Sequence, residues 1–207
     1  MSDAIDYLLQ ARPEAMQPYF SFLKQSGKKL DPKTRALISV ISKVHGRTER
    51  GFRQYLTRAL RVGCSADEVL DALLAAFPMI GLSGLIWATD ILLDMDLPEF
   101  KPEALGSEPQ WHTVGRIDEI DDGVSRLACD NRELFIYRNG DVIKVYDSRC
   151  PHQVTNIPQL ALSDCTLTCP KHEWQFDIST GECIAKGNRP LTEFEHKIED
   201  GRLLAYW

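Results

Sequence analysis

The sequence predicts an α+β protein in which an all-α helical N-terminal domain precedes an all-β antiparallel sandwich domain. Apolar residues recur at helical spacing through the first hundred residues. From Trp111 onward they alternate in short runs separated by turn residues. The stretch between them, Leu97 to Gln110, holds three prolines and no apolar period. We therefore predict a helical domain at 1–97, a linker at 98–110 and a second domain at 111–207.

Start and stop signals divide the helical region. Asp31 is an N-cap residue followed by proline at the first helical position, and Ser65 opens a capping box with Glu68. Gly63 ends the helix before that box. The expected helices are Asp6–Gln10, Pro13–Lys24 with an alternative start at Pro18, Pro32–Val44, Thr48–Val62, Ala66–Phe77 and Leu85–Leu93. The last is apolar nearly all round, so we expect it to be buried, against the core or another subunit.

Turn signals likewise divide the strand region. Asn139-Gly140 is a strong hairpin signal, and Asp130-Asn131 and Asp200-Gly201 mark two further turns. The expected strands are Trp111–Val114, Ser125–Cys129, Glu133–Tyr137, Val142–Tyr146, a short one entering Cys169, Trp174–Asp177, Glu182–Ala185, Phe194–Ile198 and Leu203–Trp207. Many short strands with tight turns predict a sandwich or small barrel.

The charge is unevenly distributed. The formal net charge is −6, which argues against a nucleic-acid partner. Residues 1–100 hold twelve basic and twelve acidic side chains, whereas 101–207 hold twelve basic and eighteen acidic. The acidic half could be steered to a basic surface on its partner, or the charge could serve only solubility.

The six cysteines show no regular disulfide spacing. The chain starts without the basic and apolar regions of a signal peptide, and no apolar run looks long enough to span a membrane. We therefore expect the protein to be located in a reducing cytoplasm and not to associate with a membrane. Cys129 and Cys183 fall in strand patterns and are expected to be core residues.

Two short motifs offer metal ligands. Cys150 and His152 form a Cys-x-His motif, and after sixteen residues Cys169 and His172 form a Cys-x-x-His motif. Two cysteines and two histidines could bind one zinc ion. Zinc sites, however, usually keep the two cysteines together and the two histidines together. The alternating order instead suits two loops that each give one ligand to each iron of a [2Fe–2S] cluster.

At these residues the chain resembles the Rieske family, over roughly residues 110–207. The resemblance implies a [2Fe–2S] cofactor with Cys150, His152, Cys169 and His172 as its ligands. His112 and His196 are expected to be packing or surface residues. The segment Gly187 to Pro190 falls where the family has a loop that shields the cluster, although an ordinary turn is an equal reading.

Departures from the high-potential branch of that family predict a low potential. Its extra disulfide would join the positions of Thr155 and Lys171, so that bridge should be absent. Its serine and tyrosine hydroxyl donors correspond to Trp174 and Phe176. Without those donors we expect the low end of the Rieske range, about −150 mV, as in ferredoxins that serve aromatic monooxygenases.

A second resemblance covers about sixty residues from Asp31 to Thr89. The phrase Asp31-Pro32-Lys33-Thr34-Arg35-Ala36-Leu37-Ile38 and the segment 60–69 are similar to the carboxymuconolactone decarboxylase family, which implies an all-helical fold and a trimer or hexamer. The glutamate, two cysteines and histidine of its peroxidase branch correspond here to Ala36, Thr48, Gly51 and Tyr55. The helical domain therefore lacks the groups that thiol peroxidase chemistry requires. We expect Cys64 to be non-catalytic and His45 to cap a helix.

Four arginines follow helical spacing in the fourth expected helix: Arg47, Arg50, Arg58 and Arg61. They could form a solvated face, an anion site, or a docking surface for the acidic second domain.

We expect an electron carrier rather than a catalyst, with no catalytic residues assigned. The carrier would be the ferredoxin of an oxygenase system, taking electrons from a flavin reductase, with the helical domain for oligomerisation or docking. The iron site of an oxygenase itself uses two histidines and one carboxylate, but the three remaining histidines, His45, His112 and His196, are scattered over two domains. The alternatives are a lyase or hydrolase in the helical domain, with the cluster as a redox sensor, and a zinc-bound structural module.

Overall fold

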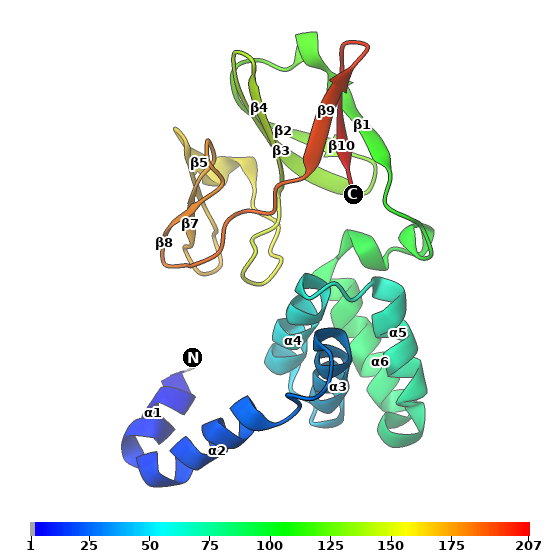
Figure 1. Cartoon of the computed structure of the whole chain (residues 1–207), viewed down its shortest axis with the longest axis vertical. Helices are drawn as coiled ribbons and strands as arrows, with labels where there is room; N and C mark the ends of the chain where they lie inside the picture. Colours follow the sequence, from blue (N-terminus) through cyan, green and yellow to red (C-terminus); the bar gives the residue numbers. More distant parts are fainter. Residues whose placement is uncertain (1–2) are drawn as a thin grey trace.

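The computed structural model describes residues 3–207, as a helical half and a strand half joined by an irregular segment (Figure 1). The helices are α1 (Asp3–Ala11), α2 (Pro13–Gln25), α3 (Pro32–His45), α4 (Glu49–Arg61), α5 (Ala66–Ala75) and α6 (Phe77–Met95). Short 3-10 turns follow at η1 (Pro98–Phe100) and η2 (Pro102–Ala104). The α+β fold class is confirmed.

The predicted helix caps are present in the structure. The Asp31 carboxylate accepts a hydrogen bond from the backbone N–H of Thr34 and caps α3. Ser65 and Glu68 form the full capping box at the start of α5. The predicted start at Pro13 is confirmed and the alternative start at Pro18 is wrong, because α2 begins at Pro13 and continues through Pro18.

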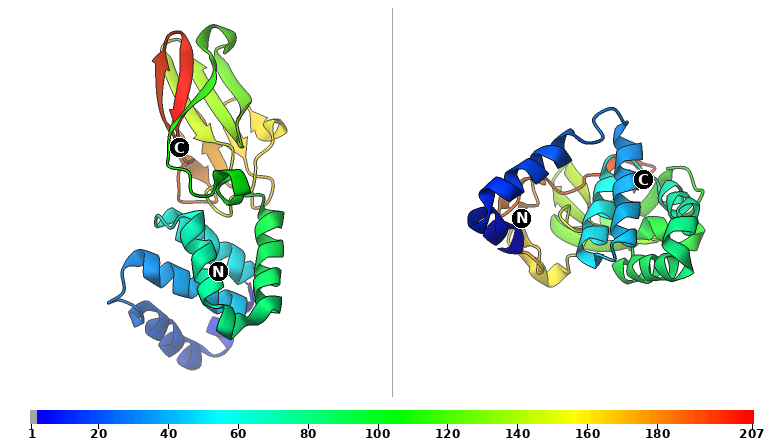
Figure 2. Two further views of the ribbon diagram at one scale, coloured as in Figure 1. Left: turned by 90° about the vertical axis from the view of Figure 1, so that its right-hand side faces the viewer. Right: turned by 90° about the horizontal axis from the view of Figure 1, so that it is seen from below.

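The core of the helical half lies among α3 to α6. Val40, Val44, Phe52 and Leu56 are fully buried there, together with Leu73. By contrast, α2 has no buried residue, and the α1–α2 pair extends away from the other helices (Figure 2). That arm packs little of its apolar surface within the chain.

Helix α6 differs from the sequence expectation in two ways. It starts at Phe77, eight residues before Leu85, and it exposes Leu82 and Leu93 rather than burying its whole circumference. Its 19 residues and mean hydropathy of 1.3 give it the length and composition of a membrane span, so the expectation of no such run was wrong. The backbone at Gly81 (φ 65°, ψ 173°) interrupts it, however. The uninterrupted part, 82–95, is about 21 Å long, less than the roughly 30 Å of a bilayer core.

The strand half consists of three antiparallel sheets. The strands are β1 (Trp111–Arg116), β2 (Gly123–Cys129), β3 (Arg132–Asn139), β4 (Val142–Asp147), β5 (Leu162–Ser163), β6 (Thr166–Thr168), β7 (Gln175–Asp177), β8 (Cys183–Ala185), β9 (Glu195–Glu199) and β10 (Arg202–Tyr206), with 3-10 turns η3 (Ile117–Glu119) and η4 (Gln159–Ala161). Their orders are β1-β10-β9, β2-β3-β4 and β5-β6-β7-β8. The predicted Asn139-Gly140 turn joins β3 to β4, which pair from Leu134↔Asp147 to Asn139↔Val142.

The sheet β5-β6-β7-β8 forms the small subdomain expected around the two motifs. Its core joins Phe176 and Ile178 to Phe135 and Tyr146 from the larger sheets. Cys150 and Cys169 belong to the same core. The second motif therefore sits on a short loop between β6 and β7, whereas the first follows β4 and is bracketed by an isolated bridge between Arg149 and Asn156.

Candidate metal centre

The two motifs form loops of the same shape. We name them the first ligand loop (150–155) and the second ligand loop (169–174). In the first, the N–H of Cys150 donates to the carbonyl of Thr155, and the N–H of Val154 donates to the carbonyl of Cys150, both at 2.8 Å. In the second, Cys169 pairs with Trp174 and Glu173 with Cys169, again at 2.8 Å.

The fifth residue of each loop has the same unusual backbone. Val154 has φ 49° and Glu173 has φ 56°, both in the left-handed region that non-glycine residues rarely adopt. This conformation closes each loop back on its cysteine. This backbone conformation is high in energy for a β-branched valine, so the contacts around the loop must maintain its closed shape.

The closed loops direct backbone N–H groups at the sulfurs. The N–H groups of His152 and Gln153 lower the pKa of Cys150, and those of Lys171 and His172 lower that of Cys169. The two thiols also share a hydrogen bond, which is the largest influence on both. It lowers the pKa of Cys169 to about 6 and raises that of Cys150, because one sulfur keeps the proton that stabilises the other as thiolate. Thiolate is the form that binds metal.

The two histidines form a second pair beside the sulfurs. The rings of His152 and His172 have centroids 4.6 Å apart. Nδ1 of His152 is buried and has no hydrogen-bond partner within residues 3–207. Burial, the largest influence on each, lowers the pKa of both histidines, and neighbouring cations lower them further. Both rings are therefore neutral near pH 7 and can act as metal ligands.

The donors converge as pairs rather than on one point. Across the described residues 3–207, no three His, Cys, Asp or Glu side chains gather as a single metal ion would require. One sulfur pair beside one imidazole pair instead suits a two-iron cluster in which each iron takes one pair. The unpartnered Nδ1 and the N–H groups aimed at sulfur are further signs of a site built for such a group.

Comparisons with known proteins agree with this geometry. Residues 110–195 match the Rieske [2Fe-2S] domain and residues 13–94 match the carboxymuconolactone decarboxylase family. The ferredoxin component of the alkene monooxygenase system of Xanthobacter autotrophicus is 30% identical over 105 residues, which cover 50% of this chain and 86% of that protein. The methanesulfonate monooxygenase ferredoxin subunit of Methylosulfonomonas methylovora is 36% identical over 90 residues, covering 43% and 73%.

The chain belongs to the Rieske [2Fe–2S] ferredoxin family. Its cofactor is a [2Fe–2S] cluster. Among solved structures, a ferredoxin of Sphingomonas yanoikuyae B1 aligns with 45% of this chain and 94% of its own, at 23% identity and a TM-score of 0.36.

An aromatic residue joins the two ligand loops. Trp174 stacks on His152 with centroids 4.6 Å apart and planes at 4°. Its other neighbour is Gly187, where an added Cβ would lie only 2.2 Å from the Trp174 ring. The segment predicted to shield the cluster therefore does lie against the site. Gly187 and Arg189 make these contacts, whereas Pro190 is exposed.

The helical half supports the first ligand loop. Val154 packs against the helical core. The guanidinium of Arg149 donates to the carbonyls of Val154 (3.1 Å), Met95 (3.4 Å) and Asp96. One side chain thus ties the first ligand loop to the C-terminal end of α6. Sequence reasoning missed this residue because two of its partners, Met95 and Asp96, are more than fifty positions away.

The remaining candidates from the sequence lie elsewhere. His112 stacks on Trp207 and contacts Asp130 at 2.6 Å, and His196 faces the carbonyl of Phe194. Burial, followed by the charge of Glu68, raises the pKa of Cys64. A raised pKa is the opposite of what a nucleophilic thiol needs.

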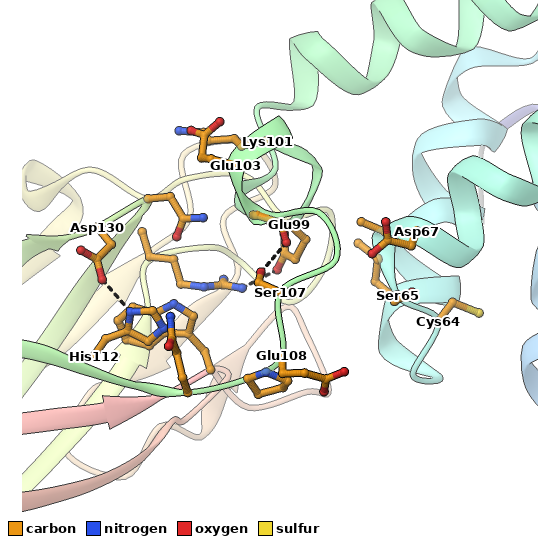
Figure 3. Close-up of a pocket in the computed structure, with 18 residues that line it drawn as sticks. Cys64, Ser65, Asp67, Glu99, Lys101, Glu103, Ser107, Glu108, His112 and Asp130 are labelled. Carbon is orange, nitrogen blue, oxygen red and sulfur yellow. Dashed lines mark hydrogen bonds and ion pairs between the residues drawn. The ribbon is translucent and has the colours of Figure 1, made fainter.

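The pocket in Figure 3 lies between the two halves but away from the ligand loops. Cys64 and Asp67 stand on its helical side, and His112 and Asp130 on its strand side, around a volume of about 770 Å³. None of the four candidate ligands lines it. It is therefore separate from the metal centre.

Proposed function

We propose that this chain is a one-electron carrier in which Cys150 and Cys169 bind one iron of the cluster and His152 and His172 bind the other. The sorting of the four side chains into a sulfur pair and an imidazole pair carries this assignment. A [2Fe–2S] cluster held there supplies one-electron redox chemistry.

The residues around the site suit that role. Cys150 and Cys169 are 1% exposed, which keeps water from the sulfurs. His172 lies on the surface, so its ring edge offers the short path along which an electron can leave or enter. Trp174 and Phe176, at the positions of the hydroxyl donors, support a potential at the low end of the Rieske range.

We propose an oxygenase component as the electron acceptor and a flavin reductase as the donor. The support is that both relatives above are ferredoxins of monooxygenase systems. We further propose a cytoplasmic location, which fits the absence of disulfides among the six cysteines within residues 3–207.

We propose that the helical half assembles chains into a trimer or hexamer. Apolar side chains are exposed on the α1–α2 arm and on the outer side of α5 and α6. They are Tyr7, Leu8, Tyr19, Phe22, Leu23, Leu74, Phe77, Met79, Leu82, Ile86 and Leu93. Exposed apolar surface of this extent on two faces of one half favours burial against further copies.

A groove in the helical half bears on the alternative, a lyase or hydrolase. It lies between α2 and the α3–α4 pair, with a volume of about 890 Å³, and contains Ala36 and Tyr55 at two of the peroxidase-branch positions. Its lining holds no carboxylate, histidine or cysteine. Its candidates for acid–base or nucleophilic chemistry are lysine, serine and tyrosine side chains alone, which favours a scaffold over a catalyst.

The test is a redox titration of the purified protein followed by absorbance and electron paramagnetic resonance. We expect a red-brown protein, a reduced-state signal of mixed histidine and cysteine ligation, and a midpoint near about −150 mV. A colourless, zinc-containing protein would refute the proposal. A midpoint far above that value would refute only the argument from Trp174 and Phe176.

The oligomer is tested separately by sedimentation or light scattering. The wild-type protein should run as a trimer or hexamer, and Leu82→Glu with Ile86→Glu should reduce it to smaller species. Lys29→Glu, on an exposed turn outside the apolar faces, is the matched control. A wild-type monomer would contradict the assembly role and leave the electron-transfer proposal standing.

A further inference from the structure

The exposed histidine edge is surrounded by positive charge, although it lies in the acidic half of the chain. Lys171 directly precedes His172, and both side chains are exposed. Arg189 donates to the carbonyl of Pro151 at 2.9 Å, and its guanidinium lies 5.4 Å from the ring centre of Trp174. Two cations of the strand half therefore flank the histidine pair.

Helix α4 brings two more cations to the same place. Arg50 and Arg61 are eleven residues apart, three helical turns, so they share one face of α4. After burial, repulsion from Arg189 is the largest influence that lowers the pKa of Arg61, which places α4 beside the shielding loop. Arg50 is near enough to His152 and His172 for its charge to act on both rings.

We call Arg50, Arg61, Lys171 and Arg189 the cationic collar. Within residues 3–207, none of the four forms an ion pair with a carboxylate.

The acidic residues next to the collar in the sequence are already paired. Glu49 pairs with Arg53, and Glu173 pairs with Lys186. The positive charge of the collar is thus left uncompensated within the chain.

This arrangement bears on one sequence-based alternative. The arginines of α4 could have docked the acidic strand half, but the charge of that half that acts on Arg61 is a cation, Arg189. The like charges are held side by side by contacts elsewhere, such as those of Arg149 and Val154. A cluster of like charges maintained in this way is free to bind an external anion.

We propose that the cationic collar is the docking surface for a redox partner whose own electron-entry site is ringed by carboxylates. This inference rests on the proposed function, because the collar matters for docking only if electrons leave through the histidine edge. It reverses one of the two readings of the net charge, in which the acidic half is steered to a basic partner. It also gives the helical half a direct part in recognition, since two of the four cations come from α4.

Complementary charge would act mainly on the rate of encounter. A carboxylate-ringed surface is attracted over about a Debye length, roughly 30 Å at 10 mM salt, and is oriented with its acceptor toward His172. A basic surface is repelled at the same place. The partner class is therefore set by the local charge and not by the chain total of −6.

The experiment measures oxidation of the reduced holoprotein by two small acceptors of opposite charge. The protein is reduced with dithionite and mixed in a stopped-flow apparatus with ferricyanide or with tris(phenanthroline)cobalt(III). Each acceptor takes one electron from the cluster, giving ferrocyanide or the cobalt(II) complex. At about 10 mM ionic strength, Arg50→Glu should slow ferricyanide roughly fivefold and accelerate the cobalt complex by a similar factor.

Lys29→Glu is the matched control, because it makes the same charge change on an exposed turn between α2 and α3. It should alter both rates by less than about 1.5-fold, and all differences should vanish in 1 M salt. Poly-L-glutamate, a stand-in for an acidic protein face, should slow the oxidation of the wild-type protein by ferricyanide. It should leave the oxidation rate of Arg50→Glu unchanged.

Equal effects of Arg50→Glu and Lys29→Glu would overturn the collar, because they would reflect net charge alone. Protection by poly-L-lysine instead of poly-L-glutamate would also overturn it. Lys171→Glu provides a second variant from the strand half, with cluster absorbance as its check on assembly. A protein without an oxidisable cluster would show no signal with either acceptor, which separates failure of the proposed function from failure of the collar.

Discussion

The two ligand loops have the same backbone shape in opposite surroundings. Each closes with two hydrogen bonds of 2.8 Å and a fifth residue at positive φ. The first ligand loop is clamped to the helical half through Arg149 and Val154. The second ligand loop exposes residues 171–173, and within residues 3–207 the side chain of Glu173 pairs only with the exposed Lys186.

This difference separates two tasks that the site must combine. The clamped loop holds half-buried His152, on which Trp174 of the second ligand loop stacks, so it fixes geometry. The free loop presents His172 to the surface, so it provides access. An electron carrier needs a rigid site and an exposed edge, and here each property belongs to a different loop.

The largest effect should come from removing a sulfur of the free loop. We expect Cys169→Ser to abolish the visible absorbance, because one iron would keep a single thiolate. Cys165→Ser is the matched control, since Cys165 is an exposed free thiol four residues away. Iron content and absorbance measure both. A retained cluster in Cys169→Ser would contradict the ligand assignment.

The contacts of Arg149 should stabilise the fold more than the surface ion pair between Lys186 and Glu173. Arg149 is 13% exposed and bonds three carbonyls, so Arg149→Ala should lower the free energy of unfolding by about 3 kcal/mol. Lys186→Ala removes the ion pair of the second ligand loop and should leave the free energy of unfolding unchanged. Denaturant unfolding of the holoprotein measures both. Equal losses would erase the contrast between the loops.

The contact that joins the loops is tested at Gly187. Gly187→Ala would force a Cβ against Trp174 and shift the ring that stacks on His152. We expect a loss of about 2 kcal/mol and a change in midpoint potential. Gly115→Ala, in β1 with open space around its Cα, is the control and should change neither. An unaltered potential in Gly187→Ala would show that the stack does not tune the site.

The smallest effect concerns the turn after the free loop. The carboxylate of Asp177 accepts hydrogen bonds from the N–H (2.8 Å) and hydroxyl (2.6 Å) of Ser179, which lower its pKa below the ordinary 3.8. A lowered pKa stabilises the fold above the ordinary value, and this stabilisation is lost as pH falls from about 4 through the lower folded value. We expect less than about 1 kcal/mol because water screens the group. Asp177→Asn should flatten this part of the pH–stability curve, and an unchanged slope would disprove the assignment.

The candidate ligands were predictable because their order along the chain reflects the chemistry. Alternating cysteine and histidine in two motifs points to two loops that share two irons. Helix caps at Asp31 and Ser65 and the Asn139-Gly140 turn were predictable because they depend on neighbouring residues.

Features that depend on packing between distant segments were not predictable. The approach of Arg50 and Arg61 to the histidine edge requires the placement of the two halves. The partial exposure of α6 depends on which side meets α3 and α5, while its apolar sequence alone suggested full burial. The clamp by Arg149 has the same origin, because a lone arginine before Cys150 carries no sequence signal.

The contact between Arg149 and the end of α6 also has a consequence for the order of events during synthesis. A chain leaves the ribosome N-terminus first, and its domains generally fold as units in that order. The carbonyls of Met95 and Asp96 are therefore available before Arg149 and Cys150 emerge. We expect the helical half to act as a template on which the first ligand loop closes, so that iron–sulfur delivery meets a loop already shaped to receive it.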